Sequence, residues 1–148
     1  METRQITTLD ELKDIAREVV SSCVQKENAH VVTLTGDLGA GKTAFTKELA
    51  KLLGITHEIT SPTFVIMKAY EIPDHPFFKK LVHIDAYRIE SDDEMRVLGF
   101  NEILSDPTNL VCIEWPEKIK DLIPKDAYSL SLTLNLDETR TITYGKSN

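Results

Sequence analysis

The segment from Gly36 to Thr43 holds the residues of this chain whose spacing most clearly indicates a chemistry. Its sequence, GDLGAGKT, fills the pattern G-x-x-x-x-G-K-[ST] between a β-branched apolar run and an amphipathic stretch. A glycine-rich turn lets backbone N–H groups converge on a polyphosphate. A helix that begins near Lys42 would direct its N-terminal dipole at the same anion. The segment therefore predicts a phosphate-binding loop.

Two side chains at the end of this loop are expected to bind the phosphates and their metal ion. Lys42 is expected to reach the β- and γ-phosphates of a nucleotide, and the Thr43 hydroxyl is expected to ligate Mg²⁺. The residues expected to contact the nucleotide in and directly after the loop are Asp37, Leu38, Gly39, Ala40, Gly41, Lys42, Thr43 and Ala44.

Two acidic residues each follow an apolar run. Asp85 ends the run over residues 81–84, and Glu114 ends the run over residues 110–113. At the carboxyl ends of parallel strands, both would lie in the crevice where open α/β sheets bind ligands, beside a phosphate-bound Mg²⁺. Either acid alone could instead be a solvated strand end. Their positions do not rank one as metal ligand and the other as catalytic group.

A polar loop, Glu58–Phe64, which ends in the segment Ser61–Phe64, follows the helix after the phosphate loop, and Pro62 keeps it out of regular structure. Many phosphate-loop proteins place a segment that senses the γ-phosphate at this point in the chain. A plain connection to a strand over residues 64–70 explains the same residues equally well. The sequence leaves both interpretations open.

Capping signals and periodicity predict the helices that must position these groups. Thr8 and Glu11 form a capping-box pattern, and apolar residues at helical spacing continue from there to about Gln25. The helix after the phosphate loop carries one apolar face and stops at Gly54.

The later part of the chain completes the predicted fold. Residues 92–98 suggest a short helix closed by Gly99, and alternating leucines from Ala127 predict an antiparallel hairpin at the edge of the sheet. We expect residues 1–148 to form one α/β domain with a three-layer fold like that of P-loop NTPases. Its central sheet would be mostly parallel, with antiparallel C-terminal edge strands.

Composition narrows the possible partners and compartment. A net charge of −7 and a pI near 5.1 argue against a broad basic surface that follows phosphates, so tight direct nucleic-acid binding is not expected. No apolar run reaches the roughly 18–20 residues of a membrane span, and the N-terminus lacks a secretory pattern. Cys23 and Cys112 lie in apolar contexts without a CxxC pair, as expected of buried free thiols in a reducing cytoplasm.

The nucleotide is expected to be ATP. The Asn-Lys pair of the guanine-reading N-K-x-D motif does not occur, and no Asp is followed by Gly three residues later, as the second switch of GTPases requires. A nucleoside kinase usually has an arginine-rich lid, but the five arginines of this chain are dispersed.

Four motifs in a fixed order point to a family. They are GDLGAGKT at 36–43, SPTF at 61–64, HIDAYR at 83–88 and EWPE at 114–117. Together they closely resemble the bacterial TsaE family, the ATPase of tRNA threonylcarbamoyladenosine biosynthesis, and the resemblance covers nearly the whole chain. One departure is Ala44, where the family often has a second threonine. Its effect should be small, because Thr43 is the metal-facing hydroxyl.

The resemblance implies an ATPase that works with two partner proteins. One is a threonylcarbamoyl-transferase, which modifies the adenosine next to the anticodon of tRNA. The other is a related companion protein that dimerises with the transferase. These partners would carry the transfer chemistry, and this chain would supply nucleotide-driven turnover of the assembly.

The resemblance also implies roles for single residues. Thr43 and Glu114 match the Mg²⁺ ligands of the family, and Asp85 matches its catalytic acid, placed to orient the attacking water or the hydrated metal. Thr63 matches the γ-phosphate sensor, and Lys42 completes the catalytic set.

Other assignments concern the rim of the expected site. Thr8 would border the adenine, and Arg140 would contact the nucleotide. Trp115 would pack over the nucleotide or a partner, although simple packing explains it as well. Arg88 is a candidate arginine finger, with a salt-bridged structural arginine as the alternative. A small P-loop phosphotransferase and a nucleotide-dependent regulatory module remain as other functions.

Overall fold

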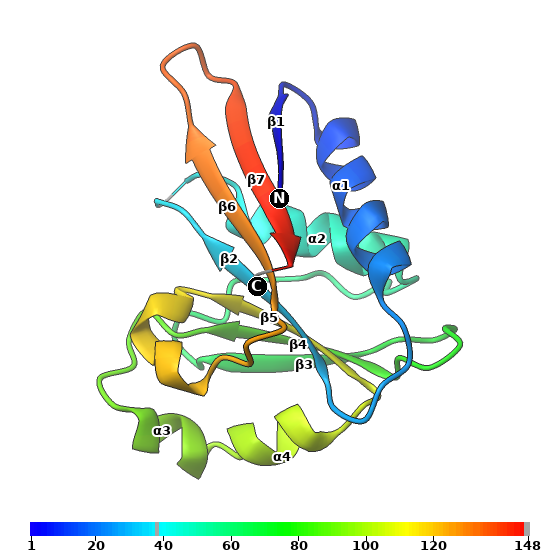
Figure 1. Ribbon diagram of the computed structural model, residues 1–148, viewed down its shortest axis with the longest axis vertical. Helices are drawn as coiled ribbons and strands as arrows, with labels where there is room; N and C mark the ends of the chain where they lie inside the picture. The colour runs from blue at the N-terminus through cyan, green and yellow to red at the C-terminus, as the bar shows by residue number, and fades with distance from the viewer. Residues whose placement is uncertain (38, 147–148) are drawn as a thin grey trace.

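The computed structural model describes residues 1–37 and 39–146. Within these ranges, seven strands join in one sheet with the order β1-β7-β6-β2-β5-β4-β3 (Figure 1). The strands are β1 (Glu2–Ile6), β2 (His30–Thr35), β3 (Met67–Glu71), β4 (Lys80–Asp85), β5 (Asn109–Glu114), β6 (Tyr128–Leu134) and β7 (Arg140–Lys146).

The centre of the sheet is parallel. Strands β6, β2, β5 and β4 run in one direction, while β1, β7 and β3 pair antiparallel with their neighbours. Strands β2, β4 and β5 are buried along nearly their whole length, as expected of apolar strands covered on both faces. Their shared direction brings their carboxyl ends to one edge of the sheet, where the register pairs Asp85 directly with Glu114.

Helices cover both faces of the sheet, so the predicted three-layer α/β fold is confirmed (Figure 1). One apolar cluster joins the sheet to α1 (Leu9–Ser22) and α2 (Lys42–Leu52). A second cluster joins the opposite face to α3 (Asp92–Val97), α4 (Phe100–Ser105) and the 3-10 segment η1 (Pro116–Leu122). None of the helices in the described ranges has the length and hydropathy that a membrane crossing requires.

Thr8 is the N-cap of α1, as predicted, but the bond that Glu11 returns goes to Thr7 and the helix is shorter than predicted. The Thr8 hydroxyl accepts the Glu11 N–H at 3.3 Å, and the Glu11 carboxylate accepts the Thr7 N–H at 3.1 Å. The helix ends at Ser22 rather than near Gln25. Its buried stripe stops at Val19, so packing no longer supports further helical turns.

The edge of the sheet differs from the prediction. The C-terminal hairpin is not at the edge, because β6 pairs with β2 and β7 pairs with β1. Strand β1 was not predicted, because its sequence ETRQI lacks an apolar alternation. Its backbone pairing with β7 forms the edge instead, supported by a 2.8 Å hydrogen bond from the Gln5 amide to the Thr139 hydroxyl.

One further strand and one further helix have boundaries that differ from the prediction. The strand predicted over residues 64–70 begins at Met67, because residues before it form a turn in which the Ile66 N–H donates to the Pro62 carbonyl at 2.6 Å. The helix predicted over 92–98 ends at Val97, and Gly99, with φ of +83°, leads directly into α4, which was not predicted.

Both cysteines are free thiols, as predicted, but only one is fully buried. Cys112 lies on β5 in the core, and burial raises the pKa of its thiol. Cys23 is partly buried at the end of α1, where its thiol donates to the Val19 carbonyl at 3.4 Å.

Candidate functional site

The loop between β2 and α2 is built on glycines that no other residue replaces without strain. Gly36, Gly39 and Gly41 have φ values of +149°, +84° and +110°. A Cβ on Gly36 would lie 2.5 Å from the Leu132 carbonyl oxygen of β6, so this strand packs directly against the loop backbone. Sequence reasoning explained these glycines by phosphate approach, and the structure adds this close contact with the sheet.

Replacing Gly36 should therefore cost more than replacing Gly39. Both replacements with alanine impose an unfavourable positive φ, worth about 1–2 kcal/mol. Gly39→Ala meets no atom within 4 Å, whereas Gly36→Ala also collides with β6. We expect Gly36→Ala to lose an additional ~1–3 kcal/mol of unfolding free energy. Urea unfolding of both variants checks this, and equal losses would contradict the contact.

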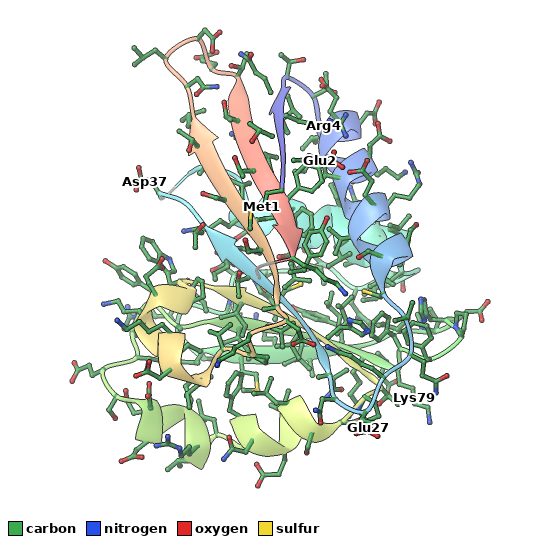
Figure 2. The ribbon with its side chains drawn as sticks, viewed as in Figure 1. Met1, Glu2, Arg4, Glu27, Asp37 and Lys79 are labelled. Atoms are coloured by element: carbon green, nitrogen blue, oxygen red, sulfur yellow. The ribbon has the colours of Figure 1, made fainter. Side chains whose placement is uncertain are left out.

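The other loop residues differ in position. The Asp37 side chain is exposed and projects from the loop beyond β2 (Figure 2). Ala40 is buried, donates its N–H to the Asp37 carbonyl at 3.0 Å and accepts from Arg140 Nε at 2.9 Å. Leu38, predicted to contact the nucleotide, lies outside the described residues.

Lys42 begins α2, and two contacts hold its ammonium group at the loop. Nζ donates to the Gly36 carbonyl at 2.5 Å and lies 3.9 Å from the centre of the Trp115 ring. Trp115 follows β5 in a left-handed conformation, with φ of +58°, and its ring lies against the Lys42 ammonium. Trp115 therefore packs on Lys42 and also on Tyr87, at 5.0 Å between ring centres.

The two predicted acids have different surroundings. Glu114 is 4% exposed, and its Oε2 accepts from the Thr43 hydroxyl at 3.3 Å. Asp85 is also 4% exposed, but Oδ2 accepts from the Thr63 hydroxyl at 2.8 Å and Oδ1 from the Tyr87 N–H at 3.0 Å. Glu114 therefore contacts the hydroxyl of the phosphate loop, and Asp85 contacts the Ser61–Phe64 loop. The positions of the two acids in the sequence did not distinguish them in this way.

A cavity of about 340 Å³ brings most of the predicted residues together. Lys42, Thr43, Thr63, Asp85, Glu114 and Arg140 are among its lining residues. A neighbouring cavity of about 130 Å³ has a mixed lining, with Leu12, Ala44 and Leu132 beside Thr8 and Arg140. Thr8 is thus not in the main cavity, and its hydroxyl already caps α1.

The donor set of the main cavity fits a hard cation. The Thr43 hydroxyl and the Glu114 carboxylate supply the oxygen ligands that Mg²⁺ prefers. In the described part of the chain, no group of three or more His, Cys, Asp or Glu side chains could hold a metal by itself. This pair therefore suits an ion that takes its remaining ligands from water and from a phosphate group.

Arg88 and His83 make contacts that the sequence did not indicate. Arg88 stacks on the exposed Phe64 ring, with 4.6 Å from Cζ to the ring centre. His83, which had no predicted role, is fully buried with Nε2 2.6 Å from Glu114 Oε2. His83 lies two residues before Asp85, so both side chains are on the same face of the strand. A polar residue inside this apolar run was the sequence signal that could have pointed to a role for His83.

Comparison with known proteins decides the family. The family model described as "Threonylcarbamoyl adenosine biosynthesis protein TsaE" matches residues 6–142. The chain belongs to the TsaE family. It is 41% identical over 106 residues to the protein of Borreliella burgdorferi named "tRNA threonylcarbamoyladenosine biosynthesis protein TsaE", with 72% of this chain and 73% of that protein covered.

Other TsaE proteins and a solved structure extend the comparison. The TsaE protein of Bacillus subtilis is 40% identical over 114 residues, with 77% of this chain and 68% of the relative covered. The solved structure titled "Crystal structure of Bacillus subtilus YdiB" superposes with a TM-score of 0.77 at 30% identity, covering 99% of this chain and 86% of YdiB. The family resemblance read from the four motifs is confirmed.

Proposed function

We propose that this TsaE-family chain binds ATP with Mg²⁺ and hydrolyses it in the threonylcarbamoyl modification of the tRNA adenosine next to the anticodon. It would act in the cytoplasm with the threonylcarbamoyl-transferase and its companion protein. The observation that carries the proposal is the convergence of Lys42, the Thr43–Glu114 pair and the Thr63–Asp85 pair on one cavity. Names of the TsaE relatives support the pathway.

The proposed mechanism assigns separate tasks to these side chains. Loop N–H groups and Lys42 bind the β- and γ-phosphates and offset their charge. Thr43 and Glu114 would hold Mg²⁺, which neutralises charge that develops between the β- and γ-phosphates when it is bound. Asp85 orients the attacking water and accepts its proton.

Thr63 would connect the catalytic acid Asp85 to the γ-phosphate. Its hydroxyl donates to Asp85 and stands at the wall of the same cavity. A γ-phosphate would offer that hydroxyl a second acceptor, so the Ser61–Phe64 loop would respond to the presence of the third phosphate. The neighbouring cavity, where Thr8 and Arg140 lie beside apolar side chains, would take the adenine ring.

Calorimetric titration with Mg-ATP and Mg-GTP tests the binding half of the proposal. ATP should bind more tightly, and Lys42→Ala should weaken ATP binding by at least about tenfold because it removes a charge-assisted contact worth about 1.5–3 kcal/mol. Lys47→Ala, on the exposed face of the same helix, is the matched control and should bind like the parent. Equal affinities for both nucleotides, or unchanged binding by Lys42→Ala, would contradict the assignment.

A further inference from the structure

His83 makes a buried polar contact that the proposed mechanism does not use. It lies on β4, whose neighbour β5 carries Glu114 at its carboxyl end (Figure 1). The His83 ring is 0% exposed, and Nε2 lies 2.6 Å from Glu114 Oε2. An ionised carboxylate oxygen only accepts hydrogen bonds, so the ring donates through Nε2–H.

The other ring nitrogen has no partner. Nδ1 of His83 is enclosed, and no hydrogen-bonding group among the described residues reaches it. Leaving a buried polar atom unpaired costs stability. The contact with Glu114 is therefore the polar interaction that accounts for a histidine at this core position, where an aliphatic side chain would avoid that cost.

Two donors converge on the same oxygen of Glu114. His83 Nε2 and the Thr43 hydroxyl both approach Oε2, at 2.6 and 3.3 Å. The hydrogen bonds of the Glu114 carboxylate within the described ranges both go to Oε2. The buried side-chain atoms without a partner there are His83 Nδ1 and Asn109 Oδ1, so Oε1 is not an enclosed, unpaired atom. Since Glu114 lines the main cavity, Oε1 is the oxygen that remains available there.

We propose that His83 is a positioning residue that fixes the Glu114 carboxylate so that one oxygen faces the Mg²⁺ site beside Thr43. The proposal rests on the proposed function, because it assumes that Mg²⁺ binds with the nucleotide at this site. A residue that orients a ligating carboxylate affects metal affinity without contacting the metal, by about 10–100-fold when it is removed.

Two variants separate positioning from packing. His83→Leu fills the position with an apolar side chain and removes the donor, whereas His83→Gln can place an amide N–H near the position of Nε2. Cys112→Ala is the control, because Cys112 is the register partner of His83 on β5 and is equally buried, whereas the hydrogen bonds of the Glu114 carboxylate within the described ranges come from His83 and Thr43.

The measurement is the Mg²⁺ concentration that half-saturates the increase in ATP affinity, beside ATP affinity in EDTA. His83→Leu should raise that concentration about 10–100-fold, His83→Gln should restore it to within a few fold, and neither should change the affinity in EDTA. Cys112→Ala should match the parent. An unchanged Mg²⁺ requirement in His83→Leu, or equal defects in the Leu and Gln variants, would overturn the proposal.

A second measurement needs neither nucleotide nor a folded variant at position 83. Nitrogen-15 NMR of the parent histidine rings should show His83 as the Nε2–H tautomer, with ring signals that shift in Glu114→Gln. The Nδ1–H tautomer, or unshifted signals, would overturn the assigned contact. If the parent binds no ATP, the proposed function fails, and the ring spectrum still decides whether His83 holds Glu114.

Discussion

Adding the threonylcarbamoyl-transferase and its companion protein should accelerate ATP hydrolysis by this chain by about 10³–10⁵, the range that an arginine or ordered switch supplied in trans provides. Phosphoryl transfer to water depends on positioning and charge neutralisation, and the lining of the cavity includes Lys42 and Arg140 as positive groups. Arg88 stacks on Phe64 outside the lining of the cavity, and Arg140 Nε is engaged by the Ala40 carbonyl. Arg140 is the one arginine among the described residues that line the cavity, so we expect a further positive group to come from a partner.

Steady-state phosphate release measures this dependence. The isolated protein should turn over well below about 1 s⁻¹, against the roughly 1–100 s⁻¹ typical of kinases. Partners should raise the rate, whereas tRNA alone should not, because a chain with net charge −7 has little affinity for a polyanion. Rapid hydrolysis by the chain alone, or stimulation by tRNA without the partner proteins, would contradict a partner-gated ATPase.

Asp85→Asn should slow ATP hydrolysis by about 10²–10³ while leaving ATP binding nearly unchanged. Asparagine keeps the shape of the side chain and loses its charge, and a preorganised electrostatic group is worth about 2.7–4 kcal/mol in the transition state. Asp85 contacts Thr63 and the Tyr87 N–H rather than the phosphate loop, so its loss should affect chemistry more than affinity.

Single-turnover hydrolysis and calorimetry with the same preparations separate the two effects. Asp93→Asn, at an exposed position on α3, is the matched control and should behave like the parent. Glu114→Ala should instead raise the Mg²⁺ concentration needed for tight ATP binding. If Asp85→Asn shows the metal defect and Glu114→Ala the slow chemistry, the two acids have exchanged roles.

Features that depend on neighbouring residues in the chain could be predicted well. The pattern from Gly36 to Thr43, the cap at Thr8 and the stop at Gly54 each record a local backbone requirement, such as a positive φ or an unpaired N–H. The buried runs that end in Asp85 and Glu114 indicated parallel strands because both faces of such strands are covered.

Tertiary structure decided what lies beside those features. The register between β4 and β5 places Asp85 next to Glu114 and leaves Glu114 in contact with His83 and Thr43, which come from separate elements. Strand β1 forms the edge because its backbone pairs with β7, although its side chains carry no apolar pattern. Such contacts depend on how strands that are distant in the sequence align across the sheet. The residues adjacent in the chain do not specify that alignment.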